Sequence, residues 1–397
     1  MRRWIEQLEQ FAIEVILENR GGKRAALLRG FLRLLAVIYE QIVQLRLWFY
    51  RKRVLRERAL GCLVISIGNL TVGGTGKTPV VEKFARALQT GGRRVAILSR
   101  GYKSKKLPLL KRLVHSLKNR EPYAPRIVSD GRSILLDSRM AGDEPYMLAL
   151  NLKDVIVLVD KNRAASGLYA VEKLGCDTLL LDDGMQYLRL KHRLEIVLID
   201  RQAPFGNEYL LPRGTLREPR RNLRRARYIF ITKSAREGDN AELIARIRKY
   251  NRTAEIIECA HRPQYLENIQ NGERVPLEWL REKYVGALSA IAVPQSFEDA
   301  LQKLGAKIEL SRHFADHHRF TDKEIEGFVK RCVHRDVDAI ITTEKDSVRL
   351  PPIKKWEVPI YFLRVEIEIL TGHENWQSCV DRICKPQSMM PPERFFA

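Results

Sequence analysis

The chain has 397 residues, of which 45% are apolar, and this is enough material for the cores of two or three domains. Its formal net charge of +22 favours a polyanionic partner, such as nucleic acid, an acidic membrane surface or a phosphorylated substrate. The six cysteines form no C-x-x-C pair, which is typical of reduced thiols in the cytosol. We expect no signal peptide, because glutamates interrupt the start of the chain at positions 6, 9, 14 and 18.

Residues 1–60 have a helical pattern, with a predicted break at Gly21 and Gly22. In the second helix, apolar residues recur on one face: Phe31, Leu34, Leu35, Ile38, Ile42, Leu45 and Phe49. The longest uncharged stretch, Leu34–Tyr39, is too short to span a bilayer. A basic segment follows this helix, so the pattern predicts either a helix in the membrane interface or one packed on its own domain.

The next segment, residues 62–87, has an apolar strand, a glycine-rich turn and an amphipathic helix in that order. This order is typical of the phosphate-binding loop of nucleotide triphosphatases and kinases. The loop residues predicted to contact the nucleotide are Thr71, Val72, Gly73, Gly74, Thr75, Gly76, Lys77 and Thr78. Glycines let backbone N–H groups approach an anion, and the helix N-terminus adds partial positive charge.

Within this loop, Lys77 is predicted to reach the β- and γ-phosphates, and the Thr78 hydroxyl is predicted to bind Mg²⁺. The loop is a variant, because Thr71 stands where the standard spacing has a glycine. A glycine-rich turn with a chance GKT sequence is the alternative, and the flanking strand and helix argue against it.

Further strands are predicted at residues 94–99, 155–159 and 178–181, with a turn at Asp130-Gly131 and a helix that begins near Asp143 and Glu144. Residues 103–120 are predicted to form a basic surface insertion, either solvated or in contact with an acidic surface. The strand at 178–181 ends in Asp182 and Asp183. In phosphate-loop enzymes a carboxylate at this place holds Mg²⁺ directly or through water.

Two more strands, at residues 194–199 and 228–232, flank an arginine-rich stretch at residues 211–227. Arginine binds phosphate through two parallel hydrogen bonds. We therefore expect Arg213 or Arg217, which lie in a Pro/Gly loop, in the active site, and a solvent-facing role for the other arginines.

Beyond residue 255 the chain begins a second α/β unit. An extended crossing segment is expected at 256–259 and 264–266, and strands at 285–292, 308–310, 339–342 and 358–365. Between them, Asp316, His317 and His318 form a dense polar group. Adjacent histidines point in different directions, so zinc is not expected. A histidine here can instead orient a carboxylate base or relay its proton.

The motifs SIGNLTVGGTGKTP, LSRGY, AGDEP, LDDGMQ, LPRGTLREP, FADHHRF and TTEKD occur in this order, and by them the chain resembles the tetraacyldisaccharide 4′-kinase family of lipid A biosynthesis. The resemblance extends to about residue 370. It implies an ATP- and Mg²⁺-dependent kinase that phosphorylates the 4′-hydroxyl of tetraacyldisaccharide 1-phosphate to give lipid IV-A. It also implies location at the cytoplasmic face of a Gram-negative inner membrane.

The family's roles carry over to matching positions. The resemblance implies that Asp143 is the general base and His317 its partner, and that Glu144, Asp182 and Asp183 are active-site acids that include the metal ligands. It implies that Lys77 and Thr78 bind the nucleotide and Mg²⁺, and that Arg213 or Arg217 is the active-site arginine. The N-terminal extension, the basic segment after Lys103 and the tail at 384–397 depart from the family pattern.

The resemblance also implies two α/β/α domains with mainly parallel sheets and an N-terminal helix that rests in the membrane. We therefore expect amphipathic membrane-interface helices at 1–60, a P-loop NTPase-like kinase domain at 61–255, and a smaller α/β domain at 256–397 with a crossing linker at its start. We expect a monomer whose partners are a lipid A precursor and the membrane surface. A membrane-associated switch ATPase and a nucleic-acid-binding ATPase are the alternatives. Nucleic acid is not expected, because aromatic residues do not interleave with the basic runs.

Overall fold

The computed structural model describes residues 10–101, 124–236, 238–351 and 356–384. The chain forms two compact units: unit 1 comprises residues 1–100, 160–260 and 369–397, and unit 2 comprises residues 101–159 and 261–368. Strands β8 (Glu255–Asn268) and β13 (Ile360–Thr371) each carry the chain from one unit into the other. The domain limits predicted from the sequence stay a prediction, because a division into compact units does not by itself define domains.

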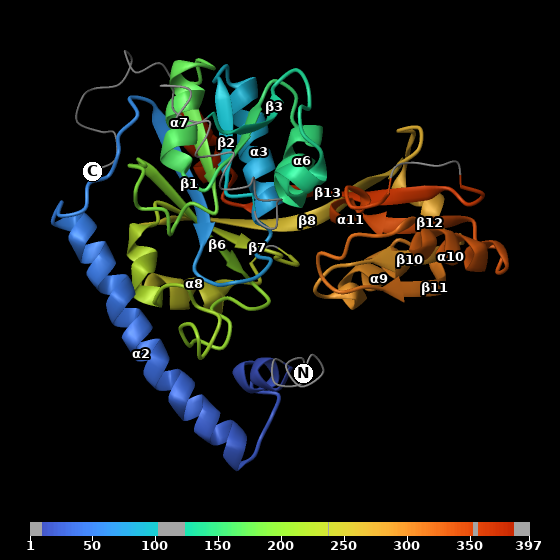
Figure 1. The fold of residues 1–397 in the computed structure, drawn as a ribbon, viewed down its shortest axis with the longest axis horizontal. Coiled ribbons are helices and arrows are strands. Elements are labelled where there is room, and N and C mark those ends of the chain that lie inside the picture. Colours follow the sequence, from blue (N-terminus) through green and yellow to red (C-terminus); the bar gives the residue numbers. More distant parts are fainter. Residues whose placement is uncertain (1–9, 102–123, 237, 352–355, 385–397) are drawn as a thin grey trace, which may run out of the picture. The chain divides into compact units, whose positions relative to one another are not determined.

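Unit 1 is built on a parallel sheet (Figure 1). Its strand order is β8-β7-β6-β1-β5-β2, and each neighbouring pair runs parallel. The strands are β1 (Leu63–Asn69), β2 (Val95–Ser99), β5 (Thr178–Asp182), β6 (Leu194–Asp200) and β7 (Tyr228–Thr232). Every residue of β2, β5, β6 and β7 is buried, as parallel strands covered on both faces require. The predicted parallel sheet is thus confirmed.

Helices pack on this sheet through apolar faces. They are α3 (Lys77–Thr90), α7 (Arg163–Glu172), α8 (Ala241–Arg248) and α12 (His373–Cys384), with the short 3-10 helix η1 (Arg220–Arg225). The predicted apolar face of α3 is confirmed, because Val80, Val81, Phe84 and Leu88 are all buried. The Trp376 ring of α12 lies edge-on against Phe84, with centroids 4.5 Å apart.

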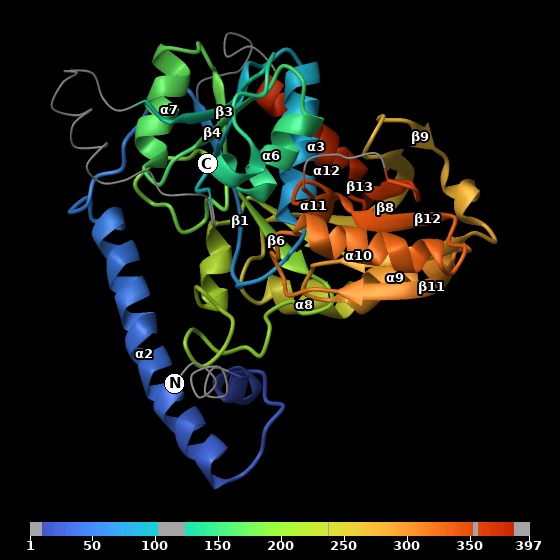
Figure 2. The same cartoon turned by 45° about the vertical axis from the view of Figure 1, so that its right-hand side comes forward.

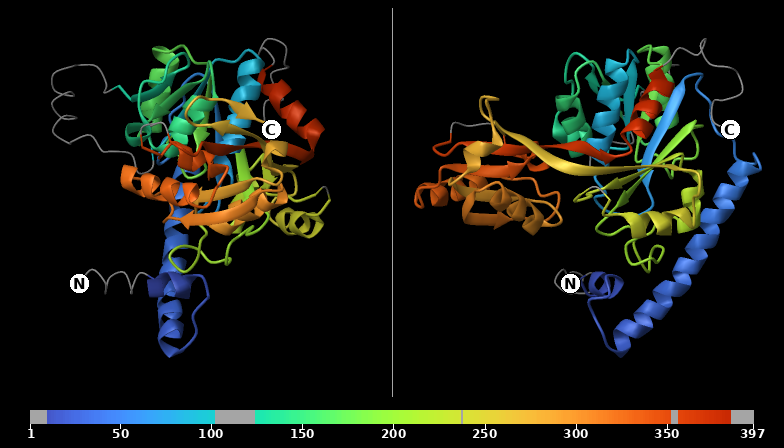
Figure 3. Two further views of the ribbon diagram at one scale, coloured as in Figure 1. Left: turned by 90° about the vertical axis from the view of Figure 1, so that its right-hand side faces the viewer. Right: turned by 180° about the vertical axis from the view of Figure 1, so that it is seen from behind.

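Residues 10–16 are helical, and the long helix α2 (Lys23–Arg51) begins after the predicted break at Gly21 and Gly22. Figure 3 shows α2 as a long straight rod along unit 1. One side of α2 packs on its unit through Ala36, which joins a core cluster with Leu210 and Leu216. No helix among the described residues is long and apolar enough to cross a membrane.

Unit 2 has its own parallel sheet, in the order β11-β10-β12-β13 (Figure 2). The strands are β10 (Tyr284–Ser289), β11 (Lys307–His313), β12 (Ala339–Thr343) and β13. Its helices are α9 (Pro294–Lys303), α10 (Asp322–Val333) and the short α11 (Glu344–Ser347). The strand β9 (Arg274–Val275) pairs antiparallel with β8 and leads into the 3-10 helix η2 (Leu277–Leu280).

The segment 124–159 of unit 2 differs from the parallel pattern. Its strands β3 (Arg126–Asp130) and β4 (Ile156–Val159) pair antiparallel, and the helices α5 (Ser138–Ala141) and α6 (Asp143–Asn151) lie between them in the chain. The predicted turn at Asp130-Gly131 is confirmed, since the Asp130 carboxylate accepts hydrogen bonds from the N–H groups of Arg132 and Ser133. The predicted insertion at 103–120 and the tail beyond Cys384 lie outside the described residues.

Candidate active site

The loop between β1 and α3 has the backbone of an anion site. Gly73 and Gly76 have φ angles of 111° and 75°, which only glycine adopts readily. A Cβ atom added at Gly73 or Gly74 would meet nothing within 4 Å, so the space beside the loop is open. No side chain caps the N-terminus of α3, which leaves its first N–H groups to a ligand. These features fit the phosphates of a nucleotide.

Two predicted loop contacts are modified by the fold. The backbone N–H of Val72 donates to the Thr215 carbonyl at 2.8 Å, so this group is already engaged. The Thr75 carbonyl accepts from the Thr232 hydroxyl at the end of β7. The Thr75 hydroxyl itself is buried without a hydrogen-bond partner among the described residues, so its oxygen is available to a ligand.

Lys77 lies at the start of α3 with its ammonium group turned to the end of β1. Its Nζ is 3.2 Å from Asn69 Oδ1 and 3.6 Å from Asp183 Oδ1. Thr78, the next residue, is buried. The lysine that a phosphate loop needs is therefore held beside Asp183, which directly follows the neighbouring strand β5.

Asp182 and Asp183 follow one another at the end of β5 but have different partners. Asp182 is buried and accepts a hydrogen bond from the Ser99 hydroxyl at 3.1 Å. Asp183 has a φ of 55° and receives two hydrogen bonds of 2.8 Å from the Arg217 guanidinium group. Burial raises the pKa of Asp183, but the hydrogen bonds from Arg217 and the charges of Lys77, Arg217 and Arg163 outweigh it and hold the pKa at about 2.

This donor set fits Mg²⁺, which prefers a hydroxyl and one or two carboxylates together with nucleotide phosphates. Thr78, in the first turn of α3, and Asp182 and Asp183, at the end of β5 and directly after it, supply such oxygens. The described residues contain no group of three or more His, Cys, Asp or Glu side chains that could hold a metal alone.

The two candidate arginines have different surroundings. Besides Asp183, Arg217 donates to Asn69 Oδ1 and, through Nε at 3.1 Å, to the Thr71 carbonyl. The Arg213 side chain is buried against Tyr209, its Nη2 is 2.5 Å from Glu18 Oε1, and it points to the N-terminal segment. Unit 1 thus brings Arg217, and not Arg213, together with Lys77 and Asp183.

In unit 2, Asp143 begins α6 and is held by three side chains from the second half of the chain. Its two carboxylate oxygens accept hydrogen bonds of 2.8 Å from Arg319 and Arg349. His317 Nδ1 is 3.4 Å from Asp143 Oδ2. The predicted association of Asp143 with His317 is therefore present, but the shorter contacts are made by the two arginines.

His317 has a φ of 66° and lies among charged groups. Its Nδ1 is 3.1 Å from Arg349 Nη2, and its Nε2 is 3.4 Å from Lys345 Nζ and 3.8 Å from Asp316 Oδ2. Burial, the Lys345 ammonium and the Arg349 guanidinium lower the pKa of His317 below its usual value, against the opposite effect of Asp316 and Asp143. The ring is therefore neutral near pH 7.

The two remaining polar residues of this region have simpler contacts. Glu144 lies 3.9 Å from Lys345 Nζ. It belongs to unit 2, whereas Asp182 and Asp183 belong to unit 1. His318 bonds Glu324 at 3.0 Å and stacks on Phe314, with centroids 4.6 Å apart. These contacts give His318 a structural role at the start of α10.

Several known proteins are similar to this chain. The family model described as tetraacyldisaccharide-1-P 4′-kinase matches residues 28–385. The chain belongs to this family. It is 39% identical over 371 residues to the tetraacyldisaccharide 4′-kinase of Anaeromyxobacter sp. (strain K), which covers 91% of this chain and 93% of that protein. The same enzyme from Syntrophus aciditrophicus is 36% identical over 353 residues, covering 85% of this chain and 88% of that protein.

A solved structure of the family is also similar. The LpxK of Aquifex aeolicus, in a crystal structure in complex with ATP, matches with a TM-score of 0.70 and 30% identity. The match covers 90% of this chain and 100% of that chain. The expected fold class, two α/β parts with mainly parallel sheets and an N-terminal helix, is confirmed by this match within the family.

Sequence reasoning did not single out several residues of the two clusters. Asn69, Ser99, Arg319 and Lys345 lie inside the quoted motifs, so the motifs could have found them. Arg349 lies outside every quoted motif, yet its side chain is fully buried and contacts both Asp143 and Asp346 at 2.8 and 2.9 Å. Only the folded chain reveals this residue.

Proposed function

We propose that this protein transfers the γ-phosphate of ATP to the 4′-hydroxyl of tetraacyldisaccharide 1-phosphate and so forms lipid IV-A. The observation that carries the proposal is the family match over residues 28–385, which includes the phosphate loop and both clusters of charged residues. A sugar hydroxyl as acceptor requires a phosphate donor site and a group that takes the hydroxyl proton.

Unit 1 supplies the residues for the donor. The loop glycines cradle the phosphates, and Lys77 neutralises charge on the β- and γ-phosphates. Mg²⁺, when bound by Thr78 and by Asp182 or Asp183, neutralises further charge on the transferred group. Arg217 is our candidate for the arginine that stabilises the transferring phosphoryl group, because its guanidinium group is already beside Asp183 and the loop carbonyl of Thr71.

Unit 2 supplies the residues for the acceptor. Asp143 takes the proton of the 4′-hydroxyl, and the neutral ring of His317 orients Asp143 or relays the proton. Arg319 and Arg349 fix the Asp143 carboxylate from both sides, which supports a defined position for the base. Glu144 remains a candidate metal ligand or a partner of the Lys345 ammonium group.

We also propose that α2 lies in the membrane interface, at the cytoplasmic face of the inner membrane, and that the protein acts as a monomer. Five of the predicted apolar residues on α2 are 49–60% exposed: Phe31, Leu34, Ile38, Ile42 and Leu45. An exposed apolar stripe of this length is costly in water and is stabilised by lipid. This favours the interfacial helix over the alternative of a helix packed on its own domain through that face.

The test is a transfer assay with γ-labelled ATP, Mg²⁺ and tetraacyldisaccharide 1-phosphate in vesicles, with Lys77→Ala as the inactive control. Label in the lipid, located at the 4′ position by product identification, supports the kinase. Phosphate release without labelled lipid supports a switch ATPase, and release stimulated by DNA supports a nucleic-acid-binding ATPase. Either of these two results contradicts the proposal.

A further inference from the structure

The helix α2 packs on the segment that carries Arg217. Beyond the apolar contact of Ala36, three polar contacts of α2 reach residues 217–222. Glu40 pairs with Arg221 at 2.7 Å, Gln44 donates to Asn222 at 3.3 Å, and the Tyr39 hydroxyl donates to the Arg217 carbonyl at 3.0 Å. Tyr39 is the one of these three that contacts the backbone of a candidate active-site residue.

Arg217 is bound to the phosphate loop by its other groups. Its backbone N–H donates to the Leu70 carbonyl at 2.7 Å, and its Nε donates to the Thr71 carbonyl at 3.1 Å. One residue earlier, Leu216 forms a β-bridge with Thr71. The backbone N–H and the side chain of Arg217 are thus hydrogen-bonded to the phosphate loop. Its carbonyl accepts a hydrogen bond from Tyr39 on α2.

Tyr39 is suited to this contact. Burial and the nearby Glu218 raise the pKa of Tyr39, against the opposite effect of Arg217 and Arg46, so the hydroxyl keeps the proton that it donates. The adjacent residue in the chain, Ile38, is 49% exposed on the apolar side of the helix. Of these two adjacent residues of α2, Ile38 therefore lies on the side of the proposed lipid surface, and Tyr39 contacts the candidate arginine.

We infer that Tyr39 is a positioning residue for phosphoryl transfer. Its hydroxyl fixes the Arg217 backbone, and in this way the binding of α2 to lipid is coupled to the position of the Arg217 guanidinium group. The inference rests on the proposed kinase function. A positioned arginine stabilises charge that develops during transfer, so its displacement lowers kcat more than it changes the KM for the lipid.

The test compares Tyr39→Phe with the wild-type protein in the lipid-transfer assay. The variant keeps the ring that packs on the core and loses only the hydroxyl. Loss of one hydrogen bond predicts a fall in kcat of about three- to tenfold, with an unchanged KM for the lipid and unchanged sedimentation with anionic vesicles. Gln44→Ala is the matched control, because it removes a contact of α2 with the same segment but not with Arg217, and it should retain the wild-type kcat.

A double-mutant cycle with Arg217→Lys tests whether Tyr39 acts through Arg217. Tyr39→Phe should lower kcat in the wild-type background and have no further effect in the Arg217→Lys background. A wild-type kcat in Tyr39→Phe, an equal fall in Gln44→Ala, or full additivity in the cycle would overturn the inference while the kinase function stands. A wild-type protein that labels no lipid overturns the kinase function itself, and this inference with it.

Discussion

Two guanidinium groups hold one carboxylate in unit 2, and this contact governs what the candidate base can do. Arg319 and Arg349 each donate to Asp143 at 2.8 Å, and the Arg349 side chain is fully buried. A carboxylate fixed in this way loses little freedom on binding a substrate, which favours catalysis by position. The same contacts stabilise the fold, because a buried arginine without its partner is costly.

Replacement of Asp143 tests the base directly. We expect Asp143→Ala to lower kcat by about 10²–10⁴-fold, the usual contribution of general-base assistance. Asp143→Asn is the control for packing, since it keeps the shape and cannot accept the proton. Both variants should fail in the transfer assay while ATP binding is retained; near-normal turnover in either one would remove Asp143 as the base.

His317 gives the second test at this scale. Burial and the Lys345 ammonium lower the pKa of His317, so in the wild-type protein the acidic limb of the pH profile of kcat/KM should lie below the ordinary histidine value of about 6.5. Lys345→Met removes this positive charge, which raises the pKa of His317 and should move the limb to higher pH. The pH profile of kcat/KM is the measurement.

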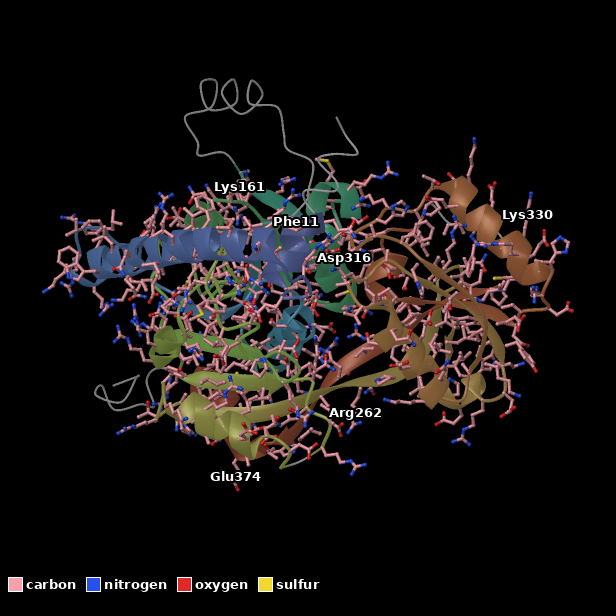
Figure 4. All side chains as sticks on the ribbon, turned by 90° about the horizontal axis from the view of Figure 1, so that it is seen from below. Phe11, Lys161, Arg262, Asp316, Lys330 and Glu374 are labelled. Carbon is pink, nitrogen blue, oxygen red and sulfur yellow. The ribbon has the colours of Figure 1, made fainter. Side chains whose placement is uncertain are left out.

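An exposed lysine of the same unit serves as the control for that profile. Lys330 is on α10, and Figure 4 labels it together with Asp316, the acid beside His317. Lys330→Met makes the same change of charge and should leave the limb in place. An unmoved limb in Lys345→Met would show that His317 does not control this ionisation.

Among the helices, α2 has one side that packs on its unit and another that exposes apolar residues. Its inner side packs through Ala36 and Leu47, which are buried, and its outer side exposes the apolar stripe. A change on the outer side can therefore alter membrane binding without disturbing the packing.

Ile42 is the position where this can be measured, because its side chain is 59% exposed. We expect Ile42→Asp to lower the partition onto anionic vesicles by about tenfold or more, since it removes apolar area from the interface and adds a negative charge there. Sedimentation with vesicles measures the partition. Asn271→Asp, which adds the same charge in an exposed turn of unit 2, should sediment like the wild-type protein; equal loss in both variants would contradict a docking role for α2.

At the scale of the whole molecule, the net charge of +22 adds a general attraction to acidic lipid. Salt screens such attraction, whereas the apolar contact of α2 is not weakened by salt. We therefore expect high salt to weaken, but not abolish, binding to anionic vesicles, and to have little effect on binding to neutral vesicles. Sedimentation of the protein with both kinds of vesicle across a salt series checks this. Binding to anionic lipid that does not change with salt would exclude an electrostatic contribution to membrane binding.

Features whose residues are neighbours in the chain could be predicted from the amino-acid sequence. The strand, glycine turn and helix at residues 62–87 form a continuous segment, and the apolar residues of α2 repeat at short intervals. Such patterns can be read from the sequence because periodicity and backbone conformation depend on short spacings. Motif order over most of the chain then indicated the family. The structure follows these expectations for the strands of the sheet in unit 1, the buried face of α3 and the break at Gly21 and Gly22, whereas the predicted strand at 285–292 already ends at Ser289.

Which of these residues contact one another could be seen only in the folded chain. Arg213 and Arg217 are equivalent candidates in the sequence, but the fold turns Arg213 to Glu18 and Arg217 to Asp183. Arg349 reaches Asp143 across 206 positions of chain. The helix α2 exposes its apolar side because its opposite side already packs on unit 1. Such contacts depend on how strands and loops distant in the chain are brought together, and no local spacing encodes that.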